Sequence, residues 1–122
     1  MLYTILIYGV PGVFARLPDD EQEAHLAVHR AVQQDLSEKD VYRGAIRLME
    51  PSTAMNVSGQ GDIVTVLDGP FAETKEQVLG LYLVECDTMD EALAAAKALP
   101  QGVAHYEVRP VNWAGGLQQP VG

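Results

Sequence analysis

Short stretches of strand-forming residues are separated by turn-forming residues along most of the chain. This pattern predicts a fold rich in strands. Six stretches combine β-branched, aromatic and aliphatic residues, and they predict strands at 2–8, 46–49, 53–57, 63–67, 81–86 and 105–111. The polar, glycine-containing cluster at 58–62 separates two of these stretches and predicts a hairpin.

A long helix is predicted from residue 18 to about residue 39, because an acidic run directly after a proline suits the positive end of a helix dipole. At 100° per residue, four side chains of this segment fall within about 60° of one another. They are His25, His29, Val32 and Leu36. Two histidines therefore lie in the apolar stripe rather than on the solvated face.

Capping patterns predict the remaining helices. Thr88 and Glu91 form a capping box that opens a helix continuing through residue 99. The same pattern at Thr74 predicts a short helix over 75–79.

The order of these elements approximates βαββαβ with an extra central hairpin, which predicts a ferredoxin-like α+β sandwich. Residues 1–111 form this single domain, and 112–122 form an extended C-terminal tail. The segments 2–8 and 81–84 are apolar almost continuously, which is typical of strands covered on both faces. Two helices cover only one face of a sheet, so we expect a second copy to cover the other, giving a homodimer.

Composition excludes several classes of protein. The formal net charge of −9 over 122 residues argues against a nucleic-acid partner, because nucleic-acid binding requires a cationic surface. No apolar run approaches the roughly 20 residues of a membrane span, and the opening segment lacks the features of a signal peptide. The single cysteine, Cys86, excludes an internal disulfide, so a cytoplasmic location is expected.

The histidine pair is a candidate for chemistry. His25 and His29 are spaced i, i+4, as two metal ligands on one helix would be, and a third ligand would come from Asp68 or His105. The glutamate of a zinc-protease helix is missing between them. A histidine in an apolar cleft also suits acid/base catalysis near neutral pH, and a purely structural role is a further alternative. No cofactor motif is present, so no cofactor is expected.

The segment Asp68-Gly69-Pro70-Phe71 is the most unusual local feature. Gly69 permits backbone angles that other residues avoid and allows close approach of a ligand, while Asp68 could point from a strand end into a cleft. The alternative is an ordinary turn in which Asp68 caps backbone amides and Phe71 plugs the core.

Glu107 and Arg109 share one face of the last predicted strand. An ion pair across strands or across a dimer interface is the simpler interpretation. The alternative is that Arg109 binds a ligand carboxylate, since a guanidinium matches carboxylate geometry.

The run from Asp68 to Gln77, DGPFAETKEQ, resembles the signature of the YCII-related domain family in its DGPF-motif branch, and the late EVRPV at 107–111 is similar too. This resemblance implies a ferredoxin-like fold that dimerises through its sheets into an α+β barrel. It also implies a cleft in which a helix histidine and an aspartate meet as an acid/base pair. The matching positions are His29 and Asp68, while His25 resembles the histidine of the non-DGPF branch. The chain departs from the family pattern at Asp40 and at Leu79-Gly80, where glycines are common.

Two functions follow as hypotheses. In the first, a small molecule binds in a cleft lined by Gly69, Phe71 and Arg109, and His29 or His25 acts with Asp68 as an acid/base pair. Such a site resembles those of relatives in the wider family that are lyases acting on chlorinated aromatic compounds, and an isomerase would use the same chemistry. In the second, the chain is a non-catalytic dimeric module that docks a protein partner such as a transcription regulator, because some DGPF domains accompany sigma factors.

Overall fold

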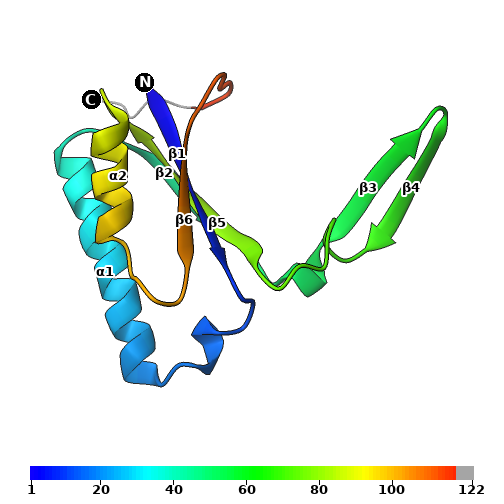
Figure 1. The fold of residues 1–122 in the computed structure, drawn as a ribbon, viewed down its shortest axis with the longest axis horizontal. Helices are drawn as coiled ribbons and strands as arrows, with labels where there is room; N and C mark the ends of the chain where they lie inside the picture. The colour runs from blue at the N-terminus through cyan, green and yellow to red at the C-terminus, as the bar shows by residue number, and fades with distance from the viewer. Residues whose placement is uncertain (118–122) are drawn as a thin grey trace.

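A computed structural model describes residues 1–117 and shows a mixed α+β architecture (Figure 1). Within residues 1–117, two α-helices and six strands follow one another. They are β1 (Leu2–Gly9), α1 (Asp19–Glu38), β2 (Tyr42–Arg47), β3 (Met55–Gln60), β4 (Ile63–Asp68), β5 (Gln77–Glu85), α2 (Met89–Ala98) and β6 (His105–Pro110), with short 3-10 helices at Phe14–Arg16 (η1) and Pro51–Thr53 (η2).

Four strands form one antiparallel sheet in the order β2-β5-β1-β6, so the first and the third of these strands along the chain lie in the centre. Both helices lie on the same face of this sheet (Figure 1). The buried core lies between the two layers, and Ile5, Val84 and Leu99 are its most completely buried large side chains. Apolar residues from alternate positions of the central strands therefore pack against the apolar stripes of the helices.

The long first helix and its histidine-bearing stripe are confirmed. Val32 and Leu36 are buried, while His25 and His29 on the same stripe are half-buried. The capping box of α2 is confirmed as well: the Thr88 hydroxyl accepts a hydrogen bond from the Glu91 amide at 3.3 Å, and the Glu91 carboxylate accepts one from the Asp87 amide at 3.1 Å.

The predicted short helix over 75–79 is wrong, because β5 begins at Gln77 and runs through most of that segment. The side-chain amide of Gln77 donates to the carbonyls of Ala72 and Thr74, at 2.8 and 2.9 Å. The polar residues that suggested a helix cap thus stabilise the turn leading into a strand. The predicted strand at 46–49 is also shifted, since β2 ends at Arg47.

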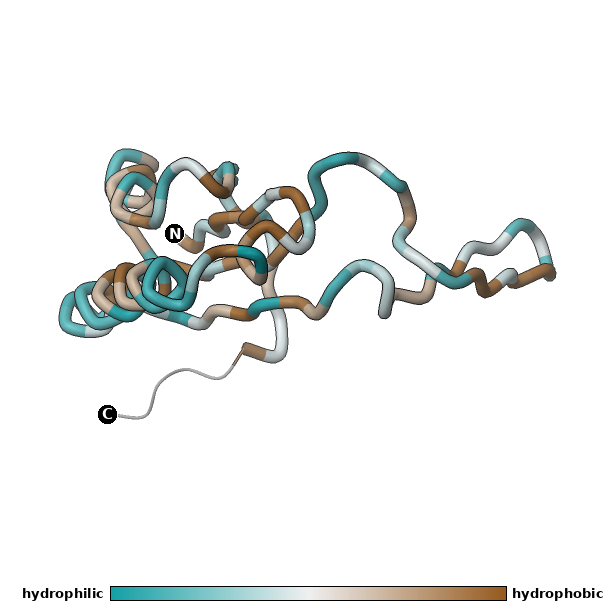
Figure 2. Tube along the Cα trace, turned by 90° about the horizontal axis from the view of Figure 1, so that it is seen from below, coloured by the Kyte–Doolittle hydropathy of each residue, from teal (hydrophilic) through white to brown (hydrophobic). Residues whose placement is uncertain are grey.

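The hairpin of β3 and β4 is confirmed, with Gln60 paired to Ile63 across a two-residue turn in which Gly61 has φ +63°. The hairpin projects away from the four-stranded sheet and from both helices (Figure 1). Directly opposed residues share a face, so Val57, Val64 and Val66 gather on one face with Met55. All four side chains are more than half exposed, and hydrophobic residues colour much of the hairpin in Figure 2.

The sheet face opposite the helices is apolar at its centre. Leu6 pairs with Leu81, and Leu83 lies two residues further along β5 on the same face. Part of the tail, residues 114–117, lies against one end of this face beside Leu2. The rest of the predicted extended tail, 118–122, falls outside the described residues. Within residues 1–117 no helix is long and apolar enough to cross a membrane.

Candidate functional site

The two helix histidines lie close together beside the 3-10 helix η1. Their ring centroids are 5.0 Å apart, and the His25 ring lies 5.0 Å from the ring of Phe14 in η1. One turn of α1 separates the histidines, so their spacing follows directly from the helical repeat. The aromatic side chain of Phe14 covers the His25 end of the pair.

His29 is held by a buried tyrosine. Its Nδ1 lies 2.7 Å from the hydroxyl of Tyr82, and the side-chain amide of Gln33 donates to the same hydroxyl at 3.0 Å. Tyr82 lies on β5 in the centre of the sheet and is only 2% exposed. The rings of His29 and Tyr82 are nearly parallel, with an interplanar angle of 6°. Together His25, His29, Gln33 and Tyr82 form what we call the histidine cluster.

Burial controls the protonation of this cluster. It lowers the pKa of His29 to about 4, and the nearby positive charges of His25 and Arg47 act in the same direction. Burial also lowers the pKa of His25 and raises the pKa of Tyr82. At neutral pH both imidazoles are therefore uncharged, and the tyrosine keeps its proton.

The hydrogen bonds at the tyrosine hydroxyl decide which nitrogen of His29 carries the proton. A phenol has one proton to donate, and the Gln33 amide already occupies one of its acceptor positions. Among the described residues, the only acceptor for the Tyr82 proton is Nδ1 of His29. A buried hydroxyl without an acceptor is costly, so the favoured arrangement has Nδ1 accepting and the proton of His29 on Nε2. His29 then presents an N–H donor on its free side.

Asp68 lies at the end of β4 on the projecting hairpin and is exposed. Within residues 1–117 no hydrogen bond or ion pair joins it to His25 or His29, so the predicted histidine–aspartate pair stays a prediction. Gly69 has φ +97°, and its amide donates to the carbonyl of Ala54 at 2.8 Å. This glycine thus takes the backbone conformation that its sequence context predicted.

The idea that Phe71 plugs the core is wrong, because its side chain is 89% exposed. Loop 69–76 leaves the hairpin without packing against the helical layer, which removes the apolar environment that such a plug requires. In the single chain Phe71 therefore contributes exposed apolar surface beside Asp68.

Arg109 and Glu107 lie on the sheet face opposite the helices, because they pair with Thr4 and Leu6. Within residues 1–117 neither side chain forms an ion pair. Arg109 therefore lies on the other side of the sheet from the histidine cluster. His105 is 76% exposed, and its Nε2 lies 3.3 Å from the carboxylate of Glu76.

For the metal hypothesis, no group of three or more His, Cys, Asp or Glu side chains within residues 1–117 is placed to hold a metal ion. The two histidines are together, but the suggested third ligands Asp68 and His105 are not beside them.

The sequence interpretation missed Gln33 and the role of Tyr82 in the cluster. Gln33 continues the spacing of the histidines at i, i+4 and i+8, so the polar stripe itself was a signal that could have found it. Tyr82 lies in the predicted strand 81–86 and is a buried core residue with a polar end. Its partner, 53 residues away along the chain, depends on how α1 lies across the sheet.

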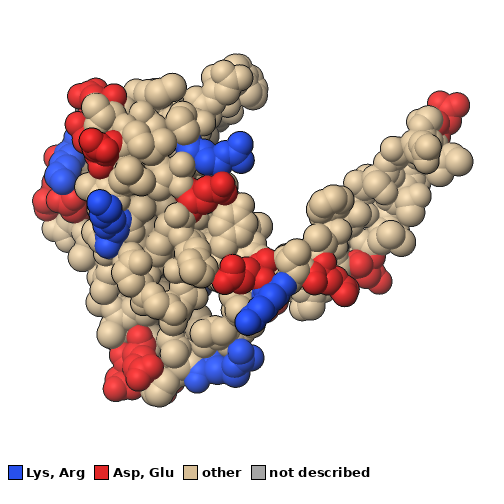
Figure 3. All heavy atoms as spheres, viewed as in Figure 1, with Lys and Arg blue, Asp and Glu red and all other residues tan. Residues whose placement is uncertain are grey.

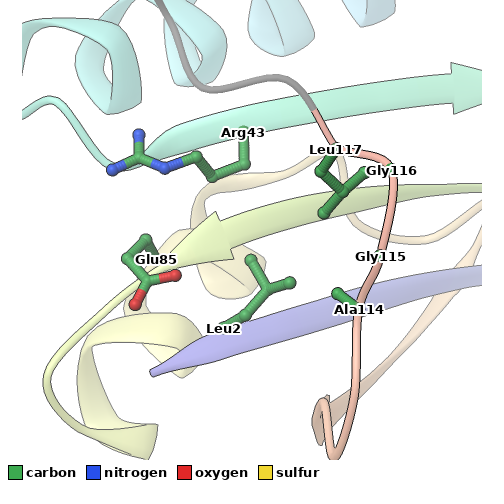
Figure 4. Close-up of a pocket in the computed structure, with 7 residues that line it drawn as sticks. All are labelled: Leu2, Arg43, Glu85, Ala114, Gly115, Gly116 and Leu117. Atoms are coloured by element: carbon green, nitrogen blue, oxygen red, sulfur yellow. The ribbon is translucent and has the colours of Figure 1, made fainter.

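Two hollows lie outside the histidine cluster. A groove of about 700 Å³ runs between the helices, lined mostly by small and aliphatic side chains of α1 and α2, with Asp35, Lys39 and Glu91 at its edges. A smaller hollow of about 190 Å³ lies between the tail and the open sheet face (Figure 4). It is lined by Leu2, Arg43, Glu85, Ala114, Gly115, Gly116 and Leu117.

Comparison with known proteins agrees with the resemblance seen in the sequence. Residues 1–113 match the model of the YCII-related domain. The chain is also similar to an uncharacterized protein of Rhizobium meliloti (strain 1021), with 37% identity over 114 residues that cover 91% of this chain and 92% of that protein. The match spans nearly all of the described fold, including the helix α1 and the strand β5 that build the histidine cluster. The chain therefore belongs to the YCII-related domain family.

Proposed function

We propose that this protein is a homodimer that binds a small molecule at the histidine cluster and catalyses a proton transfer of the isomerase or lyase type without a cofactor. The observation that carries the proposal is the 2.7 Å contact between Nδ1 of His29 and the buried Tyr82 hydroxyl. A half-buried, uncharged imidazole fixed in one orientation is a costly arrangement for a purely structural residue, and a useful one for acid/base chemistry.

The chemistry divides between the two histidines. The N–H of His29 donates to a carbonyl oxygen of the substrate, while uncharged His25, with its ring 5.0 Å away, accepts a proton from the neighbouring carbon. The electrons of the C–H bond move into an enol or enolate whose oxygen is held by His29. Return of the proton to a different carbon completes an isomerisation, and departure of a leaving group completes an elimination.

The proposed homodimer has a ferredoxin-like subunit of the DGPF-motif branch and is supported by the open, apolar sheet face around Leu6, Leu81 and Leu83. The DGPF segment supports the branch. Asp68 and Phe71 are exposed and Gly69 is half-buried, on or beside a hairpin that has no covering layer among residues 1–117. In the proposed homodimer, Asp68 of one copy reaches a histidine of the other copy.

Proton transfer is testable with oxo acids in D2O. We would incubate pyruvate, phenylpyruvate and 2-oxoglutarate with the protein and follow deuterium incorporation beside the carbonyl by ¹H NMR. We expect wild type to accelerate exchange of at least one probe, His29→Ala to lose that acceleration, and the matched control His105→Ala to keep it. Equal rates for wild type and His29→Ala with every probe would contradict the catalytic proposal.

A docking module is the second candidate, and the groove between α1 and α2 is the observation that favours it. If the protein is a docking module, His29→Ala and Asp68→Asn leave its function in the cell unchanged. Substitutions in the groove, such as Ala95→Lys, instead abolish that function. The two sets of variants therefore separate an acid/base protein from a docking protein.

A further inference from the structure

The charge around the histidine cluster differs from that of the whole protein. The chain carries a formal charge of −9, and acidic side chains gather at both ends of the helical layer in the view of Figure 3. The groups that shift the pKa of His29 are nevertheless its burial, His25 and Arg47, with no carboxylate among them. Of these groups Arg47 is the one that is charged at neutral pH, and it would attract an anion that approached His29.

Arg47 reaches the cluster from the end of the edge strand β2. In the register of β2 and β5, Arg47 pairs with Gly80, and Ala45 pairs with Tyr82. Residues two apart on a strand share a face, so Arg47 and Tyr82 lie on the same face of the sheet. They are about 7 Å apart along the strands. Gly80 makes this approach possible, since a Cβ at this position would lie 2.3 Å from the Ile46 carbonyl oxygen. Because Gly80 has no side chain, β2 can approach β5 closely at the position of Arg47.

The guanidinium of Arg47 is exposed and has no hydrogen-bond or ion-pair partner among residues 1–117. Arg30 and Lys39 have partners, since Arg30 pairs with Glu23 and Lys39 pairs with Asp35 at 2.9 Å, whereas Arg47 and Arg109 have none among these residues. An unpaired guanidinium offers a planar fork of donors that matches a carboxylate.

An aromatic side chain lies beside the same cluster. The Phe14 ring is 5.0 Å from the His25 ring. A ligand with a planar, apolar body can contact this ring while its charged end reaches the arginine.

We infer that Arg47 anchors the anionic end of the ligand, and that the ligand is a small carboxylate with a planar or aromatic body whose reacting part lies at His25 and His29. This inference rests on the proposed function and names its substrate class. It replaces Arg109, which lies on the opposite face of the sheet, as the carboxylate-binding arginine.

Benzoate and its uncharged analogue benzamide test the inference on the full chain. Binding of each is followed by ¹H–¹⁵N NMR titration, with the imidazole and Tyr82 signals as site reporters. We expect benzoate to shift these signals and to bind about tenfold more tightly than benzamide, with the preference falling as salt is raised. Arg47→Gln removes the preference, while Arg109→Gln, which removes the same charge on the other face, keeps it.

Equal affinity for the two probes would overturn the inference, and so would an unchanged preference in Arg47→Gln or shifts confined to the hollow beside Arg43. Failure of the proposed function is distinguishable. Charge-selective binding at Arg47 without any deuterium exchange would support the role of Arg47 and contradict the catalytic proposal. Deuterium exchange without a charge preference would contradict only the role of Arg47.

Discussion

At the scale of single residues, the unusual feature is an uncharged histidine supported by a tyrosine instead of a carboxylate. A carboxylate partner would raise the pKa of His29, whereas a phenol leaves burial and the neighbouring cations to lower it. The result is an N–H donor that stays neutral at physiological pH. Such a group polarises a carbonyl without adding a full charge to a half-buried site.

This protonation state predicts a loss of stability in mild acid. The pKa of His29 is about 4 in the folded chain against 6.5 as its ordinary value, so the unfolded chain binds more protons between these limits. The free energy of unfolding therefore falls as pH drops below 6.5. Between pH 6.5 and 5 the effect would be about 2 kcal/mol for a fully buried group. Solvent screening of this half-exposed ring reduces it to about 1 kcal/mol.

Urea unfolding at pH 7 and pH 5 measures the effect, with His29→Gln as the control, because its side-chain amide is polar but does not titrate. We expect wild type to lose about 1 kcal/mol more than His29→Gln between the two pH values. Identical losses would show that His29 is not held neutral.

Much of this residue-level picture could be predicted from the sequence, and part could not. The i, i+4 spacing within an apolar stripe correctly placed His25 and His29 together and half-buried. The hydrogen bond to Tyr82 could not be predicted, because it depends on the crossing of α1 over the sheet and on which strand faces that turn of the helix. The periodicity of apolar residues along the sequence gives neither the crossing of the helix nor the strand that it faces.

At the scale of elements, β5 connects the fold to the site. The residues of Gln77–Glu85 pair with β1 on one side and β2 on the other, and Tyr82 reaches α1 from the middle of this strand. The apolar run at 81–86 predicted only its second half. Its first three residues were assigned to a helix, because Thr74 and Gln77 match a capping pattern whose side chains in fact bond within the turn. Tertiary pairing with two neighbouring strands outweighs that local signal.

Gly80 is the position where this strand is least tolerant. An added Cβ would lie 2.3 Å from the Ile46 carbonyl oxygen, so Gly80→Ala must push β2 and Arg47 outward. We expect the free energy of unfolding to fall by about 2 kcal/mol or more in urea denaturation. Gly59→Ala is the matched control, because its Cβ would lie at an ordinary 3.4 Å from the Ile63 carbonyl oxygen. A Gly80→Ala protein as stable as wild type would contradict the close approach of the two strands.

At the scale of the whole molecule, the described residues of one chain leave two apolar surfaces uncovered. The sheet face opposite the helices has leucines at its centre, and the hairpin has an apolar face with no layer over it (Figures 1 and 2). A two-stranded hairpin is marginally stable by itself in water, so its projection favours a partner surface. The sequence anticipated the first surface from continuously apolar strands. The extent of the hairpin's projection could not be read from a local pattern.

The homodimer proposal therefore predicts that charge on the open face separates the subunits. Leu81→Lys places a charged group where a second sheet would pack, which costs several kcal/mol of association energy. We expect light scattering to give a dimer mass for wild type and a monomer mass for Leu81→Lys, with circular dichroism showing that the variant is folded. Ala27→Lys, on the exposed side of α1, should stay dimeric. A monomeric wild type, or a dimeric Leu81→Lys, would contradict the proposed interface.

The most direct test of the account is the long-range ¹H–¹⁵N spectrum of the His29 imidazole between pH 7 and pH 4. We predict a single neutral tautomer at pH 7, with Nδ1 as acceptor and the proton on Nε2, and a midpoint of protonation near pH 4. Tyr82→Phe removes the hydroxyl that donates to Nδ1 and should allow both tautomers. A wild-type His29 that titrates near its ordinary value of 6.5 with rapidly exchanging tautomers would contradict the central claim that Tyr82 holds an uncharged, oriented imidazole at this site.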